Sequence, residues 1–191
     1  MSHLKLEREK CVLVIIDIQE KLAAAMEPEI MRSVTRNANI LLEAARRMGI
    51  PVVLSEQYPK GLGHTVDGLQ GSLDAIDEFS RLEKVDFSVC SAEGFGEVAA
   101  RLADKKRTQW ILAGMETHIC VYQSARALCA SGATVHLAVD AVISRAKHNY
   151  RIGLDLAEKS GAILTSTETI VMDLLSRAGG DDFKAISKLI R

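Results

Sequence analysis

Three reactive side chains stand where apolar, strand-like runs meet the segments around them. Cys120 follows the run QWILAG by six residues, Asp17 closes the run CVLVIID, and Lys84 opens the segment KVDFSV. A thiolate is a strong nucleophile, and a carboxylate or an ammonium group nearby shifts the pKa of a thiol. In an open parallel sheet the strand ends share one rim, where ligands bind. A carboxylate, an ammonium group and a thiol could therefore meet there.

Cys120 carries the clearest signal of the three. The stretch AGMETHICVYQSA predicts a strand that ends at a glycine and a helix that follows it, with Thr117 as the N-cap and Cys120 as the third helical residue. Free backbone N–H groups and the positive end of the helix dipole favour a thiolate there and could hold an oxyanion. Cys129 lies nine residues further along the same helix. It is therefore too distant to resolve an oxidised Cys120.

Each of these residues also has a plain structural reading. A free cysteine is commonly a small buried apolar residue, Asp17 could cap the next turn, and most lysines are solvated. The residues taken singly leave both readings open. Their joint placement at strand ends favours a site.

Strand-like and helix-like segments alternate along the chain. The β-branched run 11–17 predicts a buried strand, and apolar residues at three- and four-residue steps predict a helix over 30–48. Residues 58–72, rich in glycine, predict a long loop. Further strands are expected at 51–56, 84–89, 109–114, 134–139 and 162–166, and further helices near 73–80, 92–105, 117–131 and 148–160, with one or two at the end. The alternation predicts an α/β, three-layer, Rossmann-like fold with a six-stranded parallel sheet flanked by helices on both faces, as a single domain over 1–191.

The composition excludes several classes of protein. Of 191 residues, 48% are hydrophobic and 26% charged, with a formal net charge of −1. Because no basic stripe is present, neither nucleic acid nor a membrane surface is expected as a partner. The first ten residues have no apolar core of a secretory signal, and the four cysteines form no CxxC pair. We therefore expect a cytoplasmic protein with reduced thiols.

Three motifs in order resemble the isochorismatase-like cysteine hydrolase family, nearly end to end. VLVIIDIQEKL resembles its first strand with the Asp-x-Gln signature at Asp17 and Gln19, KVDFSV its lysine motif at Lys84, and GMETHICV its nucleophile motif at Cys120. SEQYPKGLGHTV is closest to isochorismatase-domain-containing proteins, many of them without a settled substrate.

The resemblance implies a mechanism. Cys120 would be the nucleophile, Asp17 the general base, and Lys84 would lie between them and tune both pKa values. The oxyanion hole would be the backbone N–H groups of Glu116 and Cys120, beside a cis peptide bond between Met115 and Glu116. A small amide, ureide or carbamate would then be hydrolysed at its C–N bond through a thioester, without a cofactor.

Sequence differences from related enzymes narrow the range of expected substrates. Nicotinamidases of this family carry metal-binding histidines after the second strand, where this chain has Glu56, Gln57 and Tyr58 with His64 nearby. We therefore expect no metal, and nicotinamide is not expected as substrate. True isochorismatases often lack the cysteine, so isochorismate is not expected either.

The remaining expectations concern contacts. Gln19, Gln57 and Tyr58 are candidate substrate contacts, and Arg145 could meet an anionic group, a neighbouring subunit or solvent. A homo-oligomer, dimer or larger, is expected, with Leu174, Leu175 and residues 186–190 as a candidate interface or as core. Two rivals stay open: a catalytically silent binding or scaffold protein, and a thiol redox sensor.

Overall fold

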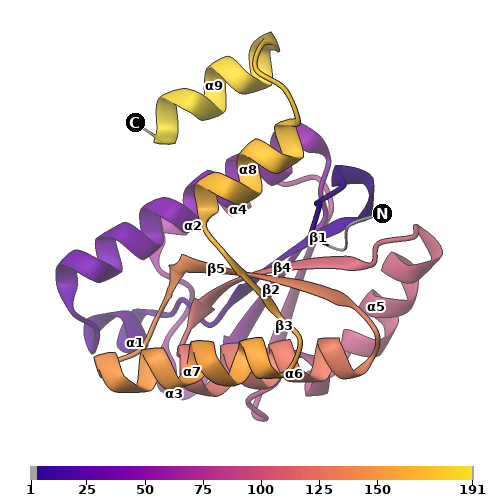
Figure 1. The fold of residues 1–191 in the computed structure, drawn as a ribbon. Coiled ribbons are helices and arrows are strands. Elements are labelled where there is room, and N and C mark those ends of the chain that lie inside the picture. The colour runs from indigo at the N-terminus through magenta and orange to yellow at the C-terminus, as the bar shows by residue number, and fades with distance from the viewer. Residues whose placement is uncertain (1–3, 191) are drawn as a thin grey trace.

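The computed structural model describes residues 4–190, and a six-stranded parallel sheet forms its centre (Figure 1). The strands are β1 (Cys11–Ile16), β2 (Val52–Gln57), β3 (Phe79–Lys84), β4 (Gln109–Met115), β5 (Thr134–Ile143) and β6 (Ile163–Thr165). They lie in the order β3-β2-β1-β4-β5-β6, and all five pairings are parallel. The predicted α/β fold class is therefore confirmed. The expected domain span also includes residues 1–3 and 191, which lie outside the described residues.

Helices cover both faces of the sheet. They are α1 (Glu20–Ala24), α2 (Pro28–Met48), α3 (Pro59–Leu62), α4 (Asp67–Leu73), α5 (Phe95–Asp104), α6 (Tyr122–Ala130), α7 (Lys147–Lys159), α8 (Thr167–Leu175) and α9 (Gly180–Ile190). Two 3-10 turns, η1 (Arg8–Lys10) and η2 (Val89–Ser91), and one π-helical turn, η3 (Thr117–Val121), complete the elements. In Figure 1, α2 and α8 lie on one side of the sheet, whereas α6 and α7 lie on the other.

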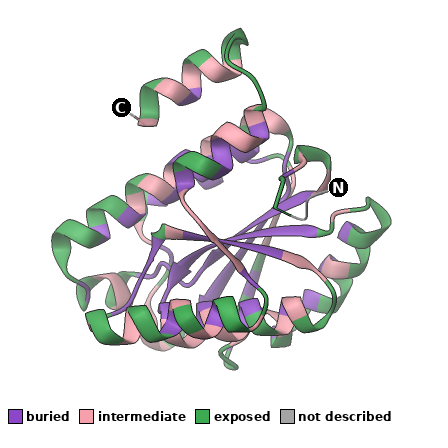
Figure 2. Ribbon diagram, in the orientation of Figure 1, coloured by how far each residue is buried: buried purple, intermediate pink, exposed green. Residues whose placement is uncertain are grey.

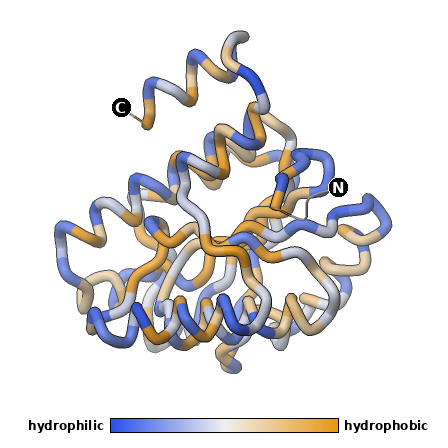
Figure 3. Tube along the Cα trace, viewed as in Figure 1, coloured by the Kyte–Doolittle hydropathy of each residue, from blue (hydrophilic) through white to orange (hydrophobic). Residues whose placement is uncertain are grey.

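The central strand β1 is buried on both of its faces, as its continuous apolar sequence predicts. Leu13 and Ile15 pack in the core under α2 and α8, and the alternate residues Val12 and Val14 pack in the core under α5, α6 and α7. Figures 2 and 3 show the result, a buried and largely apolar sheet between helices with exposed polar outer faces. This rigid centre fixes where each strand ends.

The long helix α2 has clear signals at both ends. The Glu27 side chain accepts a hydrogen bond from Ile30 N, and Pro28 occupies the first helical position. Gly49 ends the helix at φ 61°, a left-handed conformation that glycine adopts without strain. The sequence therefore fixes this helix locally, before any packing.

The third strand was predicted wrongly. It spans 79–84 rather than 84–89, and the helix expected near 73–80 is absent there, because α4 ends at Leu73 and a turn leads to the strand. As an edge strand it is only partly buried, with Leu82 and Lys84 inward, so it lacks the long apolar run that marks the other strands. The correction moves Lys84 to the carboxyl end of the strand.

Other differences are smaller. The expected loop over 58–72 contains α3 and most of α4, and the fifth strand continues past 139 to Ile143 through an irregularity in its pairing with β4. In the terminal helices Leu174 and Ile186 are buried in the core, so the core reading holds for these two, whereas Leu189 is 40% exposed and an interface there stays a prediction. Within residues 4–190, no helix has the length and apolar character needed to cross a membrane.

Candidate active site

The carboxyl ends of β1, β2 and β4 meet next to Asp17. Ile16, the last residue of β1, pairs with Ser55 on one side and with Gly114 on the other. Gly114 has a φ of 134°, and a Cβ there would collide with the backbone of Ile16. A glycine is therefore required for β4 to approach β1 this closely. Asp17 follows with a φ of 52°, and leaves the strand sharply at the rim.

Asp17 and Lys84 form a buried ion pair. The Lys84 Nζ atom donates to Asp17 Oδ2 at 2.6 Å and to Gln57 Oε1 at 2.7 Å, and Ser55 Oγ donates to Asp17 Oδ1 at 2.7 Å. Both charged side chains are 0% exposed. Burial raises the pKa of Asp17, and the bonds from Lys84 and Ser55 oppose that rise. The carboxylate is thus a stronger base than an exposed one.

The thiol of Cys120 lies against this pair and is 5% exposed. It lies close enough to Asp17 and Lys84 for both side chains to shift its pKa. Burial, followed by the charge of Asp17, raises the pKa of Cys120 to about 12, and Lys84 offsets only part of that. Burial next to Asp17 therefore opposes the thiolate that the N–H groups of the turn were expected to favour. Cys120 is placed to give its proton to Asp17.

The turn that carries Cys120 is a π-helical turn rather than the first turn of an α-helix. Val121 N donates to Glu116 O at 3.3 Å, and the Met115–Glu116 peptide bond is cis. Thr117 was expected as the N-cap, but it lies inside η3, and its buried hydroxyl has no hydrogen-bond partner within residues 4–190. Single π turns inside helices are frequent at functional sites.

Helix α7 packs directly against the backbone of η3 and holds this turn in position. A Cβ on Gly153 would fall 2.6 Å from His118 N and 2.7 Å from the carbonyl carbon of Thr117. Only glycine lets α7 lie directly on the backbone of η3. The position of Cys120 thus depends on two glycines: Gly114, which the sequence marked only as the end of a strand, and Gly153, which sequence patterns did not single out.

Two polar links tie the same turn to the loop after β5. The guanidinium group of Arg145 binds the buried carboxylate of Glu116 at 3.0 Å, and Arg145 N donates to Glu116 Oε2 at 2.9 Å. His118 Nδ1 lies 3.0 Å from Ser144 Oγ. The solvated reading of Arg145 is therefore incomplete, because its charge is partly neutralised inside the protein.

The expected substrate contacts fall into two groups. The side-chain amide of Gln19 accepts from Gln57 N and donates to Gln57 O and Gly63 O, so no amide atom of Gln19 is left for a substrate. The side chain of Gln57 holds Lys84 and donates to Val85 O at 2.5 Å. Both glutamines therefore brace the site. Tyr58 is different, because its side chain is exposed at the rim.

Exposed apolar side chains surround the rim beside Lys84. Tyr58 N donates to Lys84 O, so this tyrosine lies next to the lysine, and the exposed residues Val85 and Phe87 follow in sequence. Large apolar residues exposed together often mark a binding surface. Sequence reasoning missed Val85 and Phe87, because it placed them inside a strand.

Glu56, in the segment where no metal was expected, has a structural role. Glu56 is buried, and its Oε1 accepts from both Thr65 N and Thr65 Oγ1 at 2.7 Å. Burial alone would raise the pKa of Glu56, but these bonds, with His64 and Arg81 nearby, hold it below its usual value. Glu56 therefore anchors the segment after α3. Over the described part of the chain, no group of three or more acidic, histidine or cysteine side chains could hold a metal ion.

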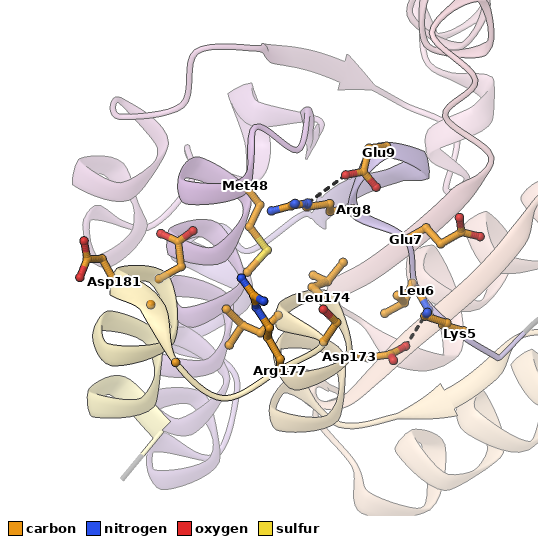
Figure 4. A pocket seen from close by; sticks show the side chains of 15 residues that line it. Lys5, Leu6, Glu7, Arg8, Glu9, Met48, Asp173, Leu174, Arg177 and Asp181 are labelled. Carbon is orange, nitrogen blue, oxygen red and sulfur yellow. Dashed lines mark hydrogen bonds and ion pairs between the residues drawn. The ribbon is translucent and has the colours of Figure 1, made fainter.

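A separate cavity of about 600 Å³ opens at the opposite edge of the sheet (Figure 4). Its walls come from the segment before β1, the end of α2 and the connection from α8 to α9. Leu6 N donates to Asp173 at 2.6 Å across it, and Arg8 pairs with Glu9. None of Asp17, Lys84 and Cys120 lines this cavity.

Comparisons with known proteins find a matching family model and several similar chains. A sequence model of the isochorismatase domain matches residues 11–169. Isochorismatase domain-containing protein 2 of Xenopus laevis is 33% identical over 97% of this chain and 86% of its own length. The secreted isochorismatase effector Isc1 of Phytophthora sojae is 32% identical over 94% of this chain and 84% of its own.

A solved structure has the same fold. The structure named MAR1 ribonuclease from Caenorhabditis elegans superposes with a TM-score of 0.86 at 33% identity, over 97% of this chain and 92% of that one. Relatives with such different names share one architecture, so the site residues must carry any statement about chemistry.

Proposed function

The chain belongs to the isochorismatase family, and on that premise we propose that it is a cysteine-dependent hydrolase of a small amide-like C–N bond, in an amide, ureide or carbamate. One observation carries the proposal. A hydrogen-bonded carboxylate and ammonium group lie buried at the carboxyl ends of the strands, with a buried thiol close enough for both to shift its pKa. Such a cluster is costly to bury, and it supplies a nucleophile with its base.

Acylation begins with proton transfer. The Cys120 sulfur adds to the substrate carbonyl carbon while its proton passes to Asp17, whose raised pKa makes it an effective acceptor. The carbonyl oxygen becomes an oxyanion, which the backbone N–H groups of Glu116 and Cys120 receive. The C–N bond then breaks, the leaving nitrogen takes the proton from Asp17, and a thioester remains on Cys120.

Deacylation reverses the roles. Water gives a proton to Asp17 as its oxygen adds to the thioester carbonyl carbon, and the same N–H groups hold the second oxyanion. The C–S bond breaks, the acid leaves, and the sulfur recovers its proton from Asp17. Lys84 stabilises each negative charge that forms beside it, while Gln57 keeps its ammonium group in place.

The side chains next to Lys84 indicate which substituent the substrate carries beside its C–N bond. Tyr58, Val85 and Phe87 are exposed apolar side chains next to Lys84. A substrate with an apolar group beside its amide would cover them, whereas a charged one would gain nothing there. Tyr58 is therefore retained as a substrate contact, and Val85 and Phe87 are added to it.

A screen of ammonia or amine release tests the proposal. Small amides, ureides and carbamates with and without an apolar substituent would be incubated with the wild-type protein, Cys120→Ala and Asp17→Asn. Turnover that disappears in both variants, with circular dichroism unchanged, is the expected result. A variant that turns over a substrate like the parent would contradict the mechanism.

The rival readings give other results. A silent scaffold would release no product from any compound, and a redox sensor would form a specific disulfide at Cys120 after peroxide treatment. RNA cleavage is a third reading, since one similar structure is named a ribonuclease. The chain has a formal net charge of −1, which offers little attraction for a polyanion. A labelled RNA substrate with the same variants separates this reading from amide hydrolysis.

A further inference from the structure

The strand β5 brings its last residues level with η3, the turn that carries the nucleophile. Its pairing with β4 is interrupted after Leu112 and resumes at the end of both strands, where Met115 lies opposite Ile143. Because β5 contains extra residues within the interruption, the residues that follow the two strands emerge side by side. Glu116 and Arg145, 29 residues apart in sequence, are therefore neighbours, and Arg145 N donates to Glu116 Oε2 at 2.9 Å.

The carboxylate of Glu116 is buried, and a single arginine side chain neutralises it. The side chain of Glu116 is 4% exposed, and Arg145 Nη2 lies 3.0 Å from its Oε1. Arg145 Nε lies 3.1 Å from Oε1 and 3.2 Å from Oε2. Within residues 4–190 no other cationic side chain pairs with Glu116. A guanidinium group that binds both carboxylate oxygens fixes the direction of the carboxylate as well as neutralising its charge.

Glu116 also carries the backbone groups that shape the turn. Its carbonyl oxygen accepts from Ile119 N at 3.0 Å and from Val121 N at 3.3 Å. Its N–H donates to no backbone acceptor within the described part of the chain. With no such bond of its own, that N–H takes its direction from the groups that hold the rest of Glu116. Arg145 holds this residue from outside the turn.

An ion pair between two exposed side chains often contributes little, because water screens both charges. Arg46 and Glu43 on α2 are such a pair, 39% and 26% exposed and joined by two contacts of 2.8 Å. The pair of Arg145 and Glu116 differs, because the arginine is 60% exposed and the carboxylate is buried. Loss of Arg145 would leave that carboxylate buried without its counter-charge. Glu116 would then turn toward water and take its N–H with it.

The contacts of Arg145 show through which residue it would act. Every side-chain hydrogen bond and ion pair of Arg145 found within residues 4–190 goes to Glu116, and none goes to Asp17, Lys84 or Cys120. Its removal should therefore change the direction of the Glu116 N–H while leaving the buried ion pair and the thiol in place.

We propose that Arg145 is a positioning residue, which holds the carboxylate of Glu116 so that the Glu116 N–H points at the oxyanion. The inference rests on the proposed function, because the oxyanion forms only when Cys120 adds to a carbonyl carbon. Removing one donor of an oxyanion hole lowers kcat about 10²–10³-fold. Displacing a donor should cost less than removing it, about 10- to 100-fold.

Two reagents separate the oxyanion from the thiol. With p-nitrophenyl acetate, the Cys120 sulfur adds to the carbonyl carbon, the carbonyl oxygen becomes an oxyanion, and p-nitrophenolate leaves. With iodoacetamide, the sulfur bonds to a saturated carbon as the C–I bond breaks and iodide leaves, so no oxyanion forms. A displaced Glu116 N–H should therefore slow only the first reaction, whereas a displaced thiol should slow both.

The test compares Arg145→Met with the wild-type protein near pH 8, with both modifications of Cys120 followed by peptide mass spectrometry. Acetylation should fall about 10- to 100-fold, and alkylation should change by no more than about twofold. An unchanged acetylation rate, or an equal fall in both rates, overturns the proposal. Circular dichroism should show that the variant is folded.

Two further variants control for charge and for loss of an arginine. Arg145→Lys keeps a cation beside Glu116 and should recover part of the lost acetylation. Arg46→Met removes the exposed pair with Glu43 and should leave both rates unchanged. Recovery that is absent in Arg145→Lys, or a loss in Arg46→Met equal to that in Arg145→Met, contradicts the assignment.

A double-mutant cycle tests whether the effect passes through Glu116. Glu116→Gln keeps the shape of the side chain but removes the buried charge that needs a partner. In that background Arg145→Met should slow acetylation much less than in the wild-type protein. Independent losses, which multiply in the double variant, would show that Arg145 acts by another route and overturn the proposal.

The wild-type protein itself separates this inference from the proposed function. No acetylation of wild-type Cys120 would refute the proposed function and this inference with it. Normal acetylation in both the wild-type protein and Arg145→Met would refute the inference alone. With an amide substrate, Arg145→Met should lower kcat and kcat/KM equally, since the oxyanion contact is made only in the transition state.

Discussion

Replacing Lys84 by methionine should destabilise the protein strongly, because it leaves a carboxylate buried without its partner. Lys84 and Asp17 are 0% exposed, and the ammonium group makes two bonds, of 2.6 and 2.7 Å. Methionine keeps most of the aliphatic volume, so little of the loss comes from packing. Removing one member of a buried pair costs about 3–5 kcal/mol. For a domain of this size, that lowers Tm by roughly 6–20 °C.

The pH dependence follows from the pKa of Asp17. Burial already raises it from 3.8, and the loss of Lys84 raises it further. A carboxyl group with a raised folded-state pKa contributes its stability below the unfolded value and loses it as pH rises through the folded value. The deficit of Lys84→Met should therefore be largest near pH 8 and smaller near pH 5.

Urea unfolding followed by circular dichroism at both pH values measures the effect. The double variant Asp17→Asn with Lys84→Met should recover stability relative to Lys84→Met, since no charge is left buried. Lys159→Met, at an exposed pair with Asp155, is the control and should change the free energy of unfolding by no more than about 0.5 kcal/mol. A change that small for Lys84→Met would refute the buried pair.

Three further predictions follow from the site. Alkylation of Cys120 by iodoacetamide should be slow at pH 7 and rise about tenfold per pH unit toward its pKa of about 12, and a plateau below pH 8 would contradict this. Gly153→Ala should destabilise by about 1–3 kcal/mol and lower kcat, because its Cβ would meet His118 N at 2.6 Å, whereas Gly96→Ala, with open space around it, should be neutral or stabilising. The acid limb of kcat/KM should lie above the ordinary carboxyl value of 3.8, since protonation of Asp17 removes the base; a limb at or below 3.8 would be inconsistent with this assignment.

The sequence predicted the strands that are buried on both faces of the sheet. The run 11–17 is apolar without interruption because β1 lies between two layers of helices. The edge strand β3 is half exposed, so its sequence alternates weakly, and the prediction moved it by five residues. Hydrophobic periodicity reflects how a segment is buried, so it predicts secondary structure poorly where a segment is only partly buried.

Of the site, the sequence predicted only which reactive side chains take part. A carboxylate, a lysine and a cysteine near strand ends can be found from sequence, and the structure brings all three into contact. The sequence shows the helix terminus near Cys120, which favours a thiolate, but it does not show the burial next to Asp17 that raises the pKa of Cys120. Gly153 and the packing role of Gly114 were missed, because each glycine is needed for an approach between distant segments.

The location of the homo-oligomer interface and the cytoplasmic localisation stay predictions. In the candidate interface of α8 and α9, Leu174 and Ile186 belong to the core while Leu189 is exposed, and one relative is named a secreted effector. Light scattering on the full chain measures the molar mass directly. A monomer at all concentrations would contradict the expected dimer or larger assembly.

The covalent intermediate is the most direct test of the central claim that Asp17, Lys84 and Cys120 act as one catalytic unit. Wild-type protein, Asp17→Asn and Cys120→Ala would be mixed with p-nitrophenyl acetate, quenched in acid within seconds and analysed by peptide mass spectrometry. The account predicts a transient acetyl thioester on the peptide containing Cys120, slower to form in Asp17→Asn and absent in Cys120→Ala. Full turnover in Cys120→Ala, or acetylation spread over other residues with none at Cys120, would contradict it.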